Sequence, residues 1–361
     1  MGEVVNVPKL AALRGRRVLV TGHTGFKGSW LCLVLNELGA DVTGYALPPE
    51  GEDSHFVLLG LDRLIRHVVG DIRDDKKLQA VFDEARPEIV FHLAAQALVR
   101  YSYDEPKLTF DTNVAGSVNV LEAVRKSNTV RSFVYITSDK CYLNREWEWG
   151  YRENDELGGR DPYSASKAAA ELVFSAYQDS FFKQRETLGA SSVRAGNVIG
   201  GGDWALDRIV PDCIRSLRNS QPIVLRSPES TRPWQHVLEP LSGYLLLAAR
   251  MYDSAKKYSS AWNFGPQSTD IRTVRDLSTT IVERWGSGKV EIDKSAAIFH
   301  EARLLCLNCD KAHQLLGWYP QWDFERTITE TVRWYREILA GTPAYVITRQ
   351  QINEYFAGFH A

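Results

Sequence analysis

Residues 16–46, RRVLVTGHTGFKGSWLCLVLNELGADVTGYA, decide the fold of this chain. A short apolar run through Val20 leads into a glycine-rich turn, and apolar residues with helical spacing follow from Trp30 to Gly39. Residues 41–46 then form a second short apolar segment. This order predicts a strand, a helix and a second strand, which is the repeating unit of a parallel sheet.

The same alternation continues through the first half of the chain. Strands are expected before Asp71 and at residues 89–93, 132–137 and 191–195, and helices at residues 113–124 and after Pro162. Repeated strand and helix predict an α/β fold with a doubly wound parallel sheet. We expect residues 1–196 to form this domain and residues 197–361 to form mainly a smaller α/β substrate lobe, with some segments returning to the first domain. An amphipathic helix is expected at residues 324–340.

The composition is that of an ordinary globular protein. The 361 residues include 44% hydrophobic residues, and 43 basic against 45 acidic residues leave a net charge of -2. Neither long disorder nor a nucleic-acid-binding surface is expected from such a balance. No apolar run is long enough to span a membrane and no signal peptide is evident, so we expect a cytoplasmic protein.

The cysteines predict free thiols. Five cysteines are an odd number scattered through a long chain, which disfavours a disulfide framework. Cys306 and Cys309 form a C-x-x-C, but no second pair or histidine cluster completes a metal site, so we expect no metal. The apolar run LLCLNC around them predicts a strand.

The turn TGHTGFKG, residues 21–28, has the spacing of a dinucleotide-binding loop in a Rossmann-type domain. Gly22 permits the tight turn, Gly25 lets the backbone approach a pyrophosphate, and Gly28 lets the helix pack closely. The helix N-terminus offers free N–H groups to the anion. The sequence thus predicts cofactor contacts from Gly22, His23, Thr24, Gly25, Phe26, Lys27 and Gly28.

The residue that usually binds the cofactor ribose is missing. Tyr45 and Ala46 stand where an acid is expected at the end of the second strand, about 20 residues on. No arginine is present there to bind a 2′-phosphate, so NAD is favoured over NADP only by default. Asp71 follows the third strand and is expected either to accept from the adenine amino group or to cap the next helix.

A tyrosine and a lysine are placed for proton abstraction at the start of the helix after Pro162. Tyr163 and Lys167 are four residues apart, so their side chains share one helix face. To take a proton from a hydroxyl near neutral pH, the tyrosine pKa must fall from about 10 by roughly three units, or about 4 kcal/mol. The lysine ammonium and a cationic nicotinamide ring are expected to supply that stabilisation.

Together, the TGxxGxxG turn, the Tyr163/Lys167 pair and Ser138 at the preceding strand end resemble the extended short-chain dehydrogenase/reductase family. The resemblance covers nearly the whole chain. It implies that Ser138, with Thr137 beside it, orients a substrate hydroxyl. It also implies cofactor contacts, beyond Tyr163 and Lys167 themselves, from Asp71, Ile72, Leu93, Ala94, Ala95, Gln96, Asn113 and Arg194.

Further segments resemble one branch of that family. Asp139-Lys140 after the strand end, GHTGFKGSWL, GNVIGGGDW and RPWQHV resemble the nucleotide-sugar 4,6-dehydratases that act on CDP-D-glucose. The implied reaction oxidises C4 with NAD, eliminates water across C5 and C6 and returns hydride to C6, feeding deoxysugar biosynthesis of the O-antigen type. The alternatives are another nucleotide-sugar 4,6-dehydratase, a UDP-sugar 4-epimerase and a non-catalytic NAD-binding sensor.

The resemblance assigns roles to the two residues after Ser138. Asp139 is the candidate acid for the C6 hydroxyl and Lys140 the candidate base for C5-H. A lysine with an ordinary pKa near 10.4 needs burial or cationic neighbours to act as a base, so Lys140 alternatively stays charged and stabilises the enolate. A purely structural ion pair between the two side chains is the remaining alternative.

Candidate substrate-binding residues lie mostly in the second half of the chain, where arginines suit a sugar diphosphate and tryptophan suits a base or sugar. Besides Ser138, they are Asn197, Arg208, Arg232, Trp234 and Arg303. The alternatives without a role in substrate binding are surface ion pairs for the arginines and core packing for Trp234. His92 and His236 are expected to be structural.

A homodimer is also expected, formed by helices near residues 107–126 and 162–180. Ala165, Ala168, Ala169, Leu172 and Val173 give the second helix a small apolar face suited to close helix packing. The alternative is that this face simply packs on the sheet of its own chain.

Overall fold

A seven-stranded parallel sheet forms the centre of the computed structural model, which describes residues 7–267, 270–293 and 304–359. The strand order is β11-β6-β5-β4-β1-β2-β3, and every neighbouring pair is parallel. The strands are β1 (Arg17–Thr21), β2 (Asp41–Ala46), β3 (Arg66–Val69), β4 (Ile89–His92), β5 (Ser132–Ile136), β6 (Gly189–Arg194) and β11 (Trp262–Asn263). The predicted doubly wound sheet is confirmed.

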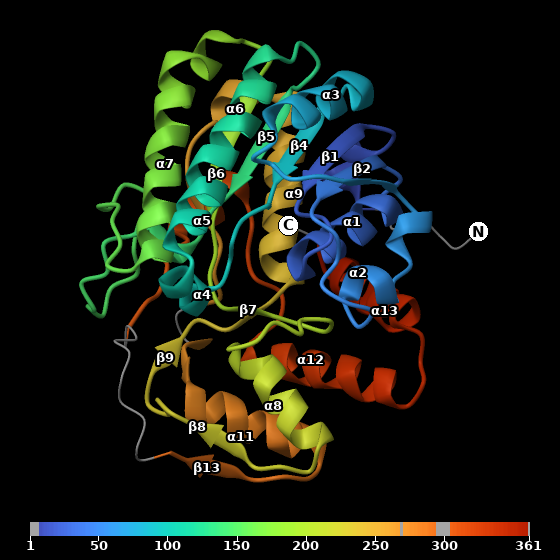
Figure 1. Cartoon of the computed structure of the whole chain (residues 1–361), viewed down its shortest axis with the longest axis vertical. Coiled ribbons are helices and arrows are strands. Elements are labelled where there is room, and N and C mark those ends of the chain that lie inside the picture. Colours follow the sequence, from blue (N-terminus) through green and yellow to red (C-terminus); the bar gives the residue numbers. More distant parts are fainter. Residues whose placement is uncertain (1–6, 268–269, 294–303, 360–361) are drawn as a thin grey trace.

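Helices cover both faces of the sheet (Figure 1). One face carries α3 (Asp75–Ala85), α6 (Ser117–Lys126) and α7 (Pro162–Ser180), and the other carries α1 (Phe26–Glu37) and α9 (Leu238–Asp253). Successive strand residues point to opposite faces, so Leu19 packs in one core cluster while Val18 and Val20 pack in the other. Such two-sided burial explains why the strands are apolar throughout.

Helix α1 is buried on nearly all sides. Its residues 28–35 are all buried, because α2 (His55–Leu58) and α13 (Ala344–Ala357) pack on it from outside. The Trp30 indole also donates a hydrogen bond to the Gly201 carbonyl at 2.9 Å. Distant segments of the chain therefore hold the helix whose first turn forms the phosphate loop.

The second half of the chain builds a smaller α/β lobe, shown below the sheet in Figure 1. Strand β11 and helices α9 and α10 from this half pack on the main sheet instead. The predicted helix at 324–340 is confirmed as α12 (Phe324–Leu339). The other elements are β7 (Val198–Ile199), α8 (Ile209–Arg218), β8 (Ile223–Leu225), β9 (Thr231–Arg232), β10 (Gln235–His236), α10 (Ala255–Tyr258), β12 (Arg272–Thr273), α11 (Val274–Trp285) and β13 (Val290–Ile292).

Short helical turns join the strands of the sheet to the long helices. The segment before α6 contains three of them, and one follows β5 directly. They are α4 (Val99–Asp104), α5 (Pro106–Phe110), the π-helical turn η3 (Asp111–Gly116) and the 3-10 turn η4 (Asp139–Cys141). The predicted helix at 113–124 thus spans η3 and α6.

The predicted strand around Cys306 is wrong. Leu307 makes only an isolated bridge to Tyr151, because this segment packs on a small aromatic cluster and not along a sheet edge. All five cysteines are free thiols, as expected. Within the described residues, no group of three or more acidic, histidine or cysteine side chains is arranged to hold a metal, and no helix is long and apolar enough to cross a membrane.

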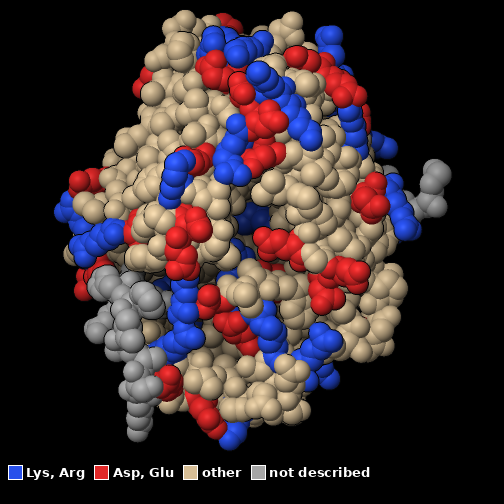
Figure 2. Space-filling view, viewed as in Figure 1, with Lys and Arg blue, Asp and Glu red and all other residues tan. Residues whose placement is uncertain are grey.

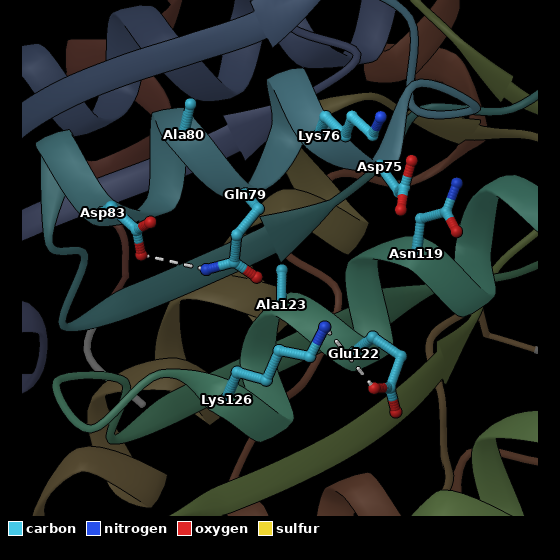
Figure 3. Close-up of a pocket in the computed structure, with 9 residues that line it drawn as sticks. All are labelled: Asp75, Lys76, Gln79, Ala80, Asp83, Asn119, Glu122, Ala123 and Lys126. Carbon is cyan, nitrogen blue, oxygen red and sulfur yellow. Dashed lines mark hydrogen bonds and ion pairs between the residues drawn. The ribbon is translucent and has the colours of Figure 1, made fainter.

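A polar groove lies on the outer surface where α3 meets α6 (Figure 3). Lys126 pairs with Glu122 at one end of the groove, and Gln79 donates a hydrogen bond to Asp83 along it. The candidate catalytic residues do not line it. This groove is a solvated charged surface. The candidate catalytic residues lie elsewhere, at the carboxyl ends of the strands.

Candidate active site

The turn after β1 is a tight backbone cradle. Gly22 has a φ of +77°, and a Cβ there would lie 2.7 Å from the Ala94 nitrogen. A Cβ at Gly28 would lie 2.1 Å from the Gly22 carbonyl oxygen, so α1 can approach the turn only through a glycine. At Gly25 the nearest atom would be 3.5 Å away. The first and third glycines serve packing, and Gly25 keeps the outer side of the loop open.

This cradle fits the pyrophosphate of a dinucleotide. Gly25 is the N-cap of α1, and the first-turn N–H groups of a helix have no partners within the helix. Those free donors and the helix dipole suit an anion at this position. The donors and the open space at Gly25 match a dinucleotide phosphate, as the glycine spacing predicts.

Two side chains of the loop are used within the protein. The buried His23 ring packs on Gly44, and its Nε2 lies 2.6 Å from Nδ1 of His67. Burial lowers the pKa of His23 to about 3, so this ring is neutral. The Thr24 hydroxyl donates to the Leu47 carbonyl at 3.0 Å. The His23 ring is therefore used within the protein, and the cofactor contact of His23, now left to its main chain, stays a prediction.

The end of β2 carries a tyrosine that binds Asp71 through its main chain. The buried Tyr45 hydroxyl donates to the Asp71 carbonyl at 2.8 Å. The Asp71 carboxylate accepts from the Arg73 amide and guanidinium, which lowers its pKa. Helix α3 is capped by Asp74, which accepts from the Lys77 amide, so the alternative of Asp71 as the cap is wrong. The adenine contact of Asp71 stays a prediction.

Asn113 joins the end of β4 to the catalytic helix. Its Oδ1 accepts from the Gln96 amide at 2.8 Å, and its Nδ2 donates to the Gln96 carbonyl and to the Ser166 hydroxyl. The expected cofactor-lining segment, Leu93 to Gln96, is thereby tied to α7. His92 beneath it is buried between Thr21 and Ser117, in the structural role expected.

Helix α7 starts with a cap and a proline that fix its first turn. The Asp161 carboxylate accepts from the Ser164 amide, and Pro162 is the first helical residue. Tyr163 and Lys167 follow on one face, with the Lys167 Nζ 5.9 Å from the centroid of the tyrosine ring. Both side chains are buried. The expected side-by-side arrangement of this pair is present.

The protein alone does not prepare Tyr163 as a base. Burial raises the pKa of Tyr163 to about 12, against the lowering effect of a hydrogen bond with Ser138. Burial also lowers the pKa of Lys167 to about 8, while the thiol of Cys141 and the carboxylate of Glu171 oppose that shift. Further positive charge, such as an oxidised nicotinamide supplies, is needed before the phenol can act near neutral pH.

Ser138 and Asp139 meet at the end of β5. The Ser138 hydroxyl donates to Oδ1 of Asp139 at 2.9 Å, and the Lys140 amide donates back to the Ser138 oxygen. Asp139 is 1% exposed, and its second oxygen, Oδ2, has no hydrogen-bond partner. A Cβ at Gly196 would lie 1.8 Å from this oxygen, so only glycine fits there. Sequence reasoning missed Gly196, because its effect depends on a contact between distant strand ends.

Arg194 is an internal residue and not a cofactor donor, which corrects the prediction. Its guanidinium forms a doubly hydrogen-bonded ion pair with the buried Glu171 of α7 at 2.8 to 2.9 Å. Its remaining nitrogen donates to the Tyr142 hydroxyl and to the Glu153 carbonyl. Because its nitrogens are used within the protein, this arginine braces β6 against α7.

The predicted substrate residues differ in how the structure places them. Arg208 precedes α8, its guanidinium 2.9 Å from Asp203, and its charge acts on Tyr163. Asn197 has a φ of +50°, and its carbonyl accepts from the Gln235 amide, which joins the starts of β7 and β10. Trp234 is buried, in line with core packing, and Arg232 is half-buried in β9. Arg303 lies outside the described residues, and the buried His236 packs between Trp30 and Trp322.

The side chains of the candidate active site lie between the sheet domain and the small lobe. Figure 2 shows a hollow near the middle of this view, with basic side-chain atoms at its bottom. The ends of β1 and β5, the start of α7 and the segment before α8 contribute the residues above. In open α/β sheets, ligands bind at this edge, outside the carboxyl ends of the strands.

Comparisons with known proteins agree with this geometry. A family model described as GDP-mannose 4,6-dehydratase matches residues 19–331. The chain belongs to this family. The match confirms the expected place among the extended short-chain dehydrogenases/reductases.

Individual relatives show how far the similarity extends. The chain is 49% identical to the CDP-glucose 4,6-dehydratase of Salmonella typhimurium, across 95% of this chain and 97% of that protein. The UDP-glucose 4-epimerase of Thermotoga maritima, solved with UDP-glucose, matches with a TM-score of 0.76 at 25% identity, across 89% and 99% of the two chains. The UDP-glucose 4-epimerase of Thermus thermophilus, solved with NAD, gives 0.72 at 26%, across 88% and 98%.

Proposed function

We propose that this enzyme converts CDP-D-glucose to CDP-4-dehydro-6-deoxy-D-glucose, with NAD as a resident cofactor. The observation that carries the proposal is the Asp139-Lys140 pair beside the Ser138, Tyr163 and Lys167 cluster, because an oxidation alone needs no second acid and base. The similarity to the Salmonella typhimurium enzyme over nearly the whole of both chains supports the sugar nucleotide. We infer that the product enters deoxysugar biosynthesis of the O-antigen type.

The first half of the reaction uses the residues of α7. NAD held by the phosphate loop supplies an acceptor for the C4 hydride and a donor for its later return. Ser138 orients the C4 hydroxyl while Tyr163 takes its proton, and the nearby Lys167 ammonium stabilises the phenolate. Burial of both side chains keeps water from competing for these contacts.

The second half uses the residues after β5. The C4 carbonyl makes the C5 proton acidic, and Lys140 either removes this proton or stabilises the resulting enolate as a cation. Asp139 protonates the C6 oxygen, which leaves as water. The Oδ2 of Asp139 faces Gly196 and has no hydrogen-bond partner among the described residues, so this oxygen is the one left for the exchange.

A substrate panel tests the proposal. The purified protein is incubated separately with CDP-, dTDP-, UDP- and GDP-linked hexoses, and products are identified by mass spectrometry and NMR. We expect a 4-keto-6-deoxy sugar from CDP-glucose at a rate well above the other nucleotides. A C4 epimer of a UDP-sugar as the main product would instead establish the epimerase activity seen in the structural neighbours.

We also propose that the enzyme works as a homodimer through the outer face of α5, η3, α6 and α7. An apolar hollow on this face is lined by residues that include Phe110, Val114 and Ala169. Leu172 on α7 is 61% exposed, although its neighbour Ala168 is buried against the chain's own core. A second copy of the same face would cover these side chains.

A further inference from the structure

Lys27 lies in the phosphate loop, but its side chain extends toward α9. It is the second residue of α1, so its main-chain N–H belongs to the phosphate cradle. Its ammonium lies 5.8 Å from the ring centroid of Tyr244 on α9, across the ends of the central strands. The charges that act on Lys27 come from Arg208, Lys167 and Asp139, three residues of the catalytic cluster.

The cluster contains one buried acid without a matched cation. Arg208 is paired with Asp203, and Glu171 is paired with Arg194. Asp139 has no ion-pair partner among the described residues, and its Oδ2 lacks even a hydrogen bond. The Lys27 ammonium likewise makes no ion pair or hydrogen bond within the described part of the chain.

The surroundings of Lys27 lower the pKa of its ammonium but leave the group charged at neutral pH. Burial, together with the charges of Arg208 and Lys167, lowers its pKa to about 8, and the charge of Asp139 opposes this shift. The Tyr244 ring beneath it is fully buried, and the Tyr244 hydroxyl has no hydrogen-bond partner. Most Lys27 side chains are therefore cationic at pH 7, in a partly buried position where a charge acts more strongly on its neighbours than it would in water.

We propose that Lys27 is a positioning residue of the elimination step: its ammonium stabilises the carboxylate that Asp139 becomes on giving its proton to the departing C6 oxygen. The inference rests on the proposed function. The C6–O bond breaks with its electron pair on oxygen, the Asp139 proton completes the water, and the C5 proton passes to the base. Lys27 keeps its protons throughout and acts by charge alone.

This role differs from that of a lysine that clamps phosphate. A phosphate clamp would lose cofactor affinity when the ammonium is removed. A positioning residue would leave the cofactor in place and slow only the step that creates charge on Asp139. The two roles therefore separate in cofactor content and in the intermediate that accumulates.

The test uses Lys27→Met and Lys27→Arg in the purified holoenzyme, with Lys76→Met on the exposed surface of α3 as the matched control. Bound NAD is measured after acid release, and ADP-ribose binding by calorimetry. Rapid mixing with CDP-glucose, read by absorbance, measures NADH formation, and mass spectrometry identifies the sugar that accumulates. The rate of product formation and the melting temperature of each variant are measured separately.

We expect Lys27→Met to keep wild-type NAD content and to form NADH on mixing, while product formation falls on the order of 10²-fold. Lys27→Arg should regain most of the loss, because it keeps the charge, and Lys76→Met should match the wild type. Loss of NAD in Lys27→Met would overturn the proposal in favour of a phosphate clamp. Unchanged product formation, or equal losses in Met and Arg variants with lowered melting temperature, would overturn it in favour of a structural role.

The failure of the proposed function gives a different result. If the wild type converts no nucleoside diphosphate hexose, the dehydratase proposal is wrong and the role of Lys27 in elimination is wrong with it. If the wild type converts a hexose of another nucleotide, the same comparison is made with that substrate. When the wild type does convert CDP-glucose, each contrary result named above for the Lys27 variants overturns the Lys27 proposal alone.

Discussion

At the residue scale, the buried phenol of Tyr163 is the group on which the first hydride transfer depends. We expect Tyr163→Phe to lower the formation of enzyme-bound NADH by about 10² to 10⁴-fold, because no other group accepts the C4 hydroxyl proton. Rapid mixing with substrate, followed by absorbance, measures this rate. Near-normal NADH formation in this variant would show that another base acts at C4.

Asp139 and Lys140 separate elimination from oxidation. Asp139→Asn and Lys140→Met should still form NADH but stall before water leaves, so the 4-keto hexose and NADH accumulate. Overall turnover should fall by about 10² to 10⁴-fold for each. Deuterium exchange at C5 distinguishes them, since a lost base stops exchange and a lost acid does not. If either variant abolishes NADH formation as fully as Tyr163→Phe does, that residue belongs to the oxidation step.

Gly196 gives a way to move Asp139 without changing its chemistry. In Gly196→Ala the added methyl group would lie 1.8 Å from Oδ2 of Asp139, so the carboxylate has to shift. We expect the same accumulation of NADH as in Asp139→Asn, with wild-type NAD content. Gly265→Ala is the control, because a Cβ there would meet its nearest neighbour at 3.5 Å. Equal activity of both variants would contradict the placement of Asp139.

At the scale of elements, Glu239 at the start of α9 joins three distant segments. Its buried carboxylate accepts from the amides of Gln321 and Trp322, and from the Tyr355 hydroxyl of α13 at 2.7 Å. Burial nevertheless raises its pKa to about 7, against the opposing effect of these hydrogen bonds. This carboxylate therefore connects the segment before α12 and helix α13 to the helix beneath the sheet.

The raised pKa predicts a pH dependence of stability. Between the ordinary value of 4.5 and about 7, the folded state binds the Glu239 proton more tightly than the unfolded state. The free energy of unfolding should therefore fall as the pH rises through this window, by up to about 3 kcal/mol from this group. Glu239→Gln removes the titration and should flatten that part of the profile. Urea unfolding from pH 5 to 8 measures it, and identical slopes in both proteins would refute the assignment.

Local patterns predicted the elements well, whereas long-range contacts decided what the sequence missed. The turn from Gly22 to Gly28 and the Tyr163/Lys167 pair are encoded within one helical turn or loop, so their spacing was sufficient. Arg194 was misjudged because its partner, Glu171, is on another element, and nothing in the local sequence indicates their pairing. The internal contact of the His23 ring could not be foreseen for the same reason, since its partner, His67, lies on strand β3.

At the scale of the whole molecule, both halves of the chain form the active site. The first half supplies the phosphate loop and the catalytic helix, and the second supplies Gly196, Arg208 and the α9 surface under Lys27. Because α9 and β11 return to the main sheet, movement of the small lobe would not carry Tyr244 with it. The candidate catalytic residues other than Arg208 thus lie on the main sheet or on elements joined to it.

The proposed dimer is tested on the same scale. The exposed apolar side chains of α4, α5 and α7, which include Tyr103, Phe110 and Leu172, lie on helices that pack side by side on one flank of the sheet. We expect analytical ultracentrifugation at micromolar concentration to give twice the chain mass of 40.8 kDa. Leu172→Glu places a charge in the centre of this face and should shift the mass to that of a monomer. Leu315→Glu, at a side chain 62% exposed outside this face, should remain dimeric. A wild-type mass of one chain, or a dimer unaffected by Leu172→Glu, would show that these helices do not form the interface.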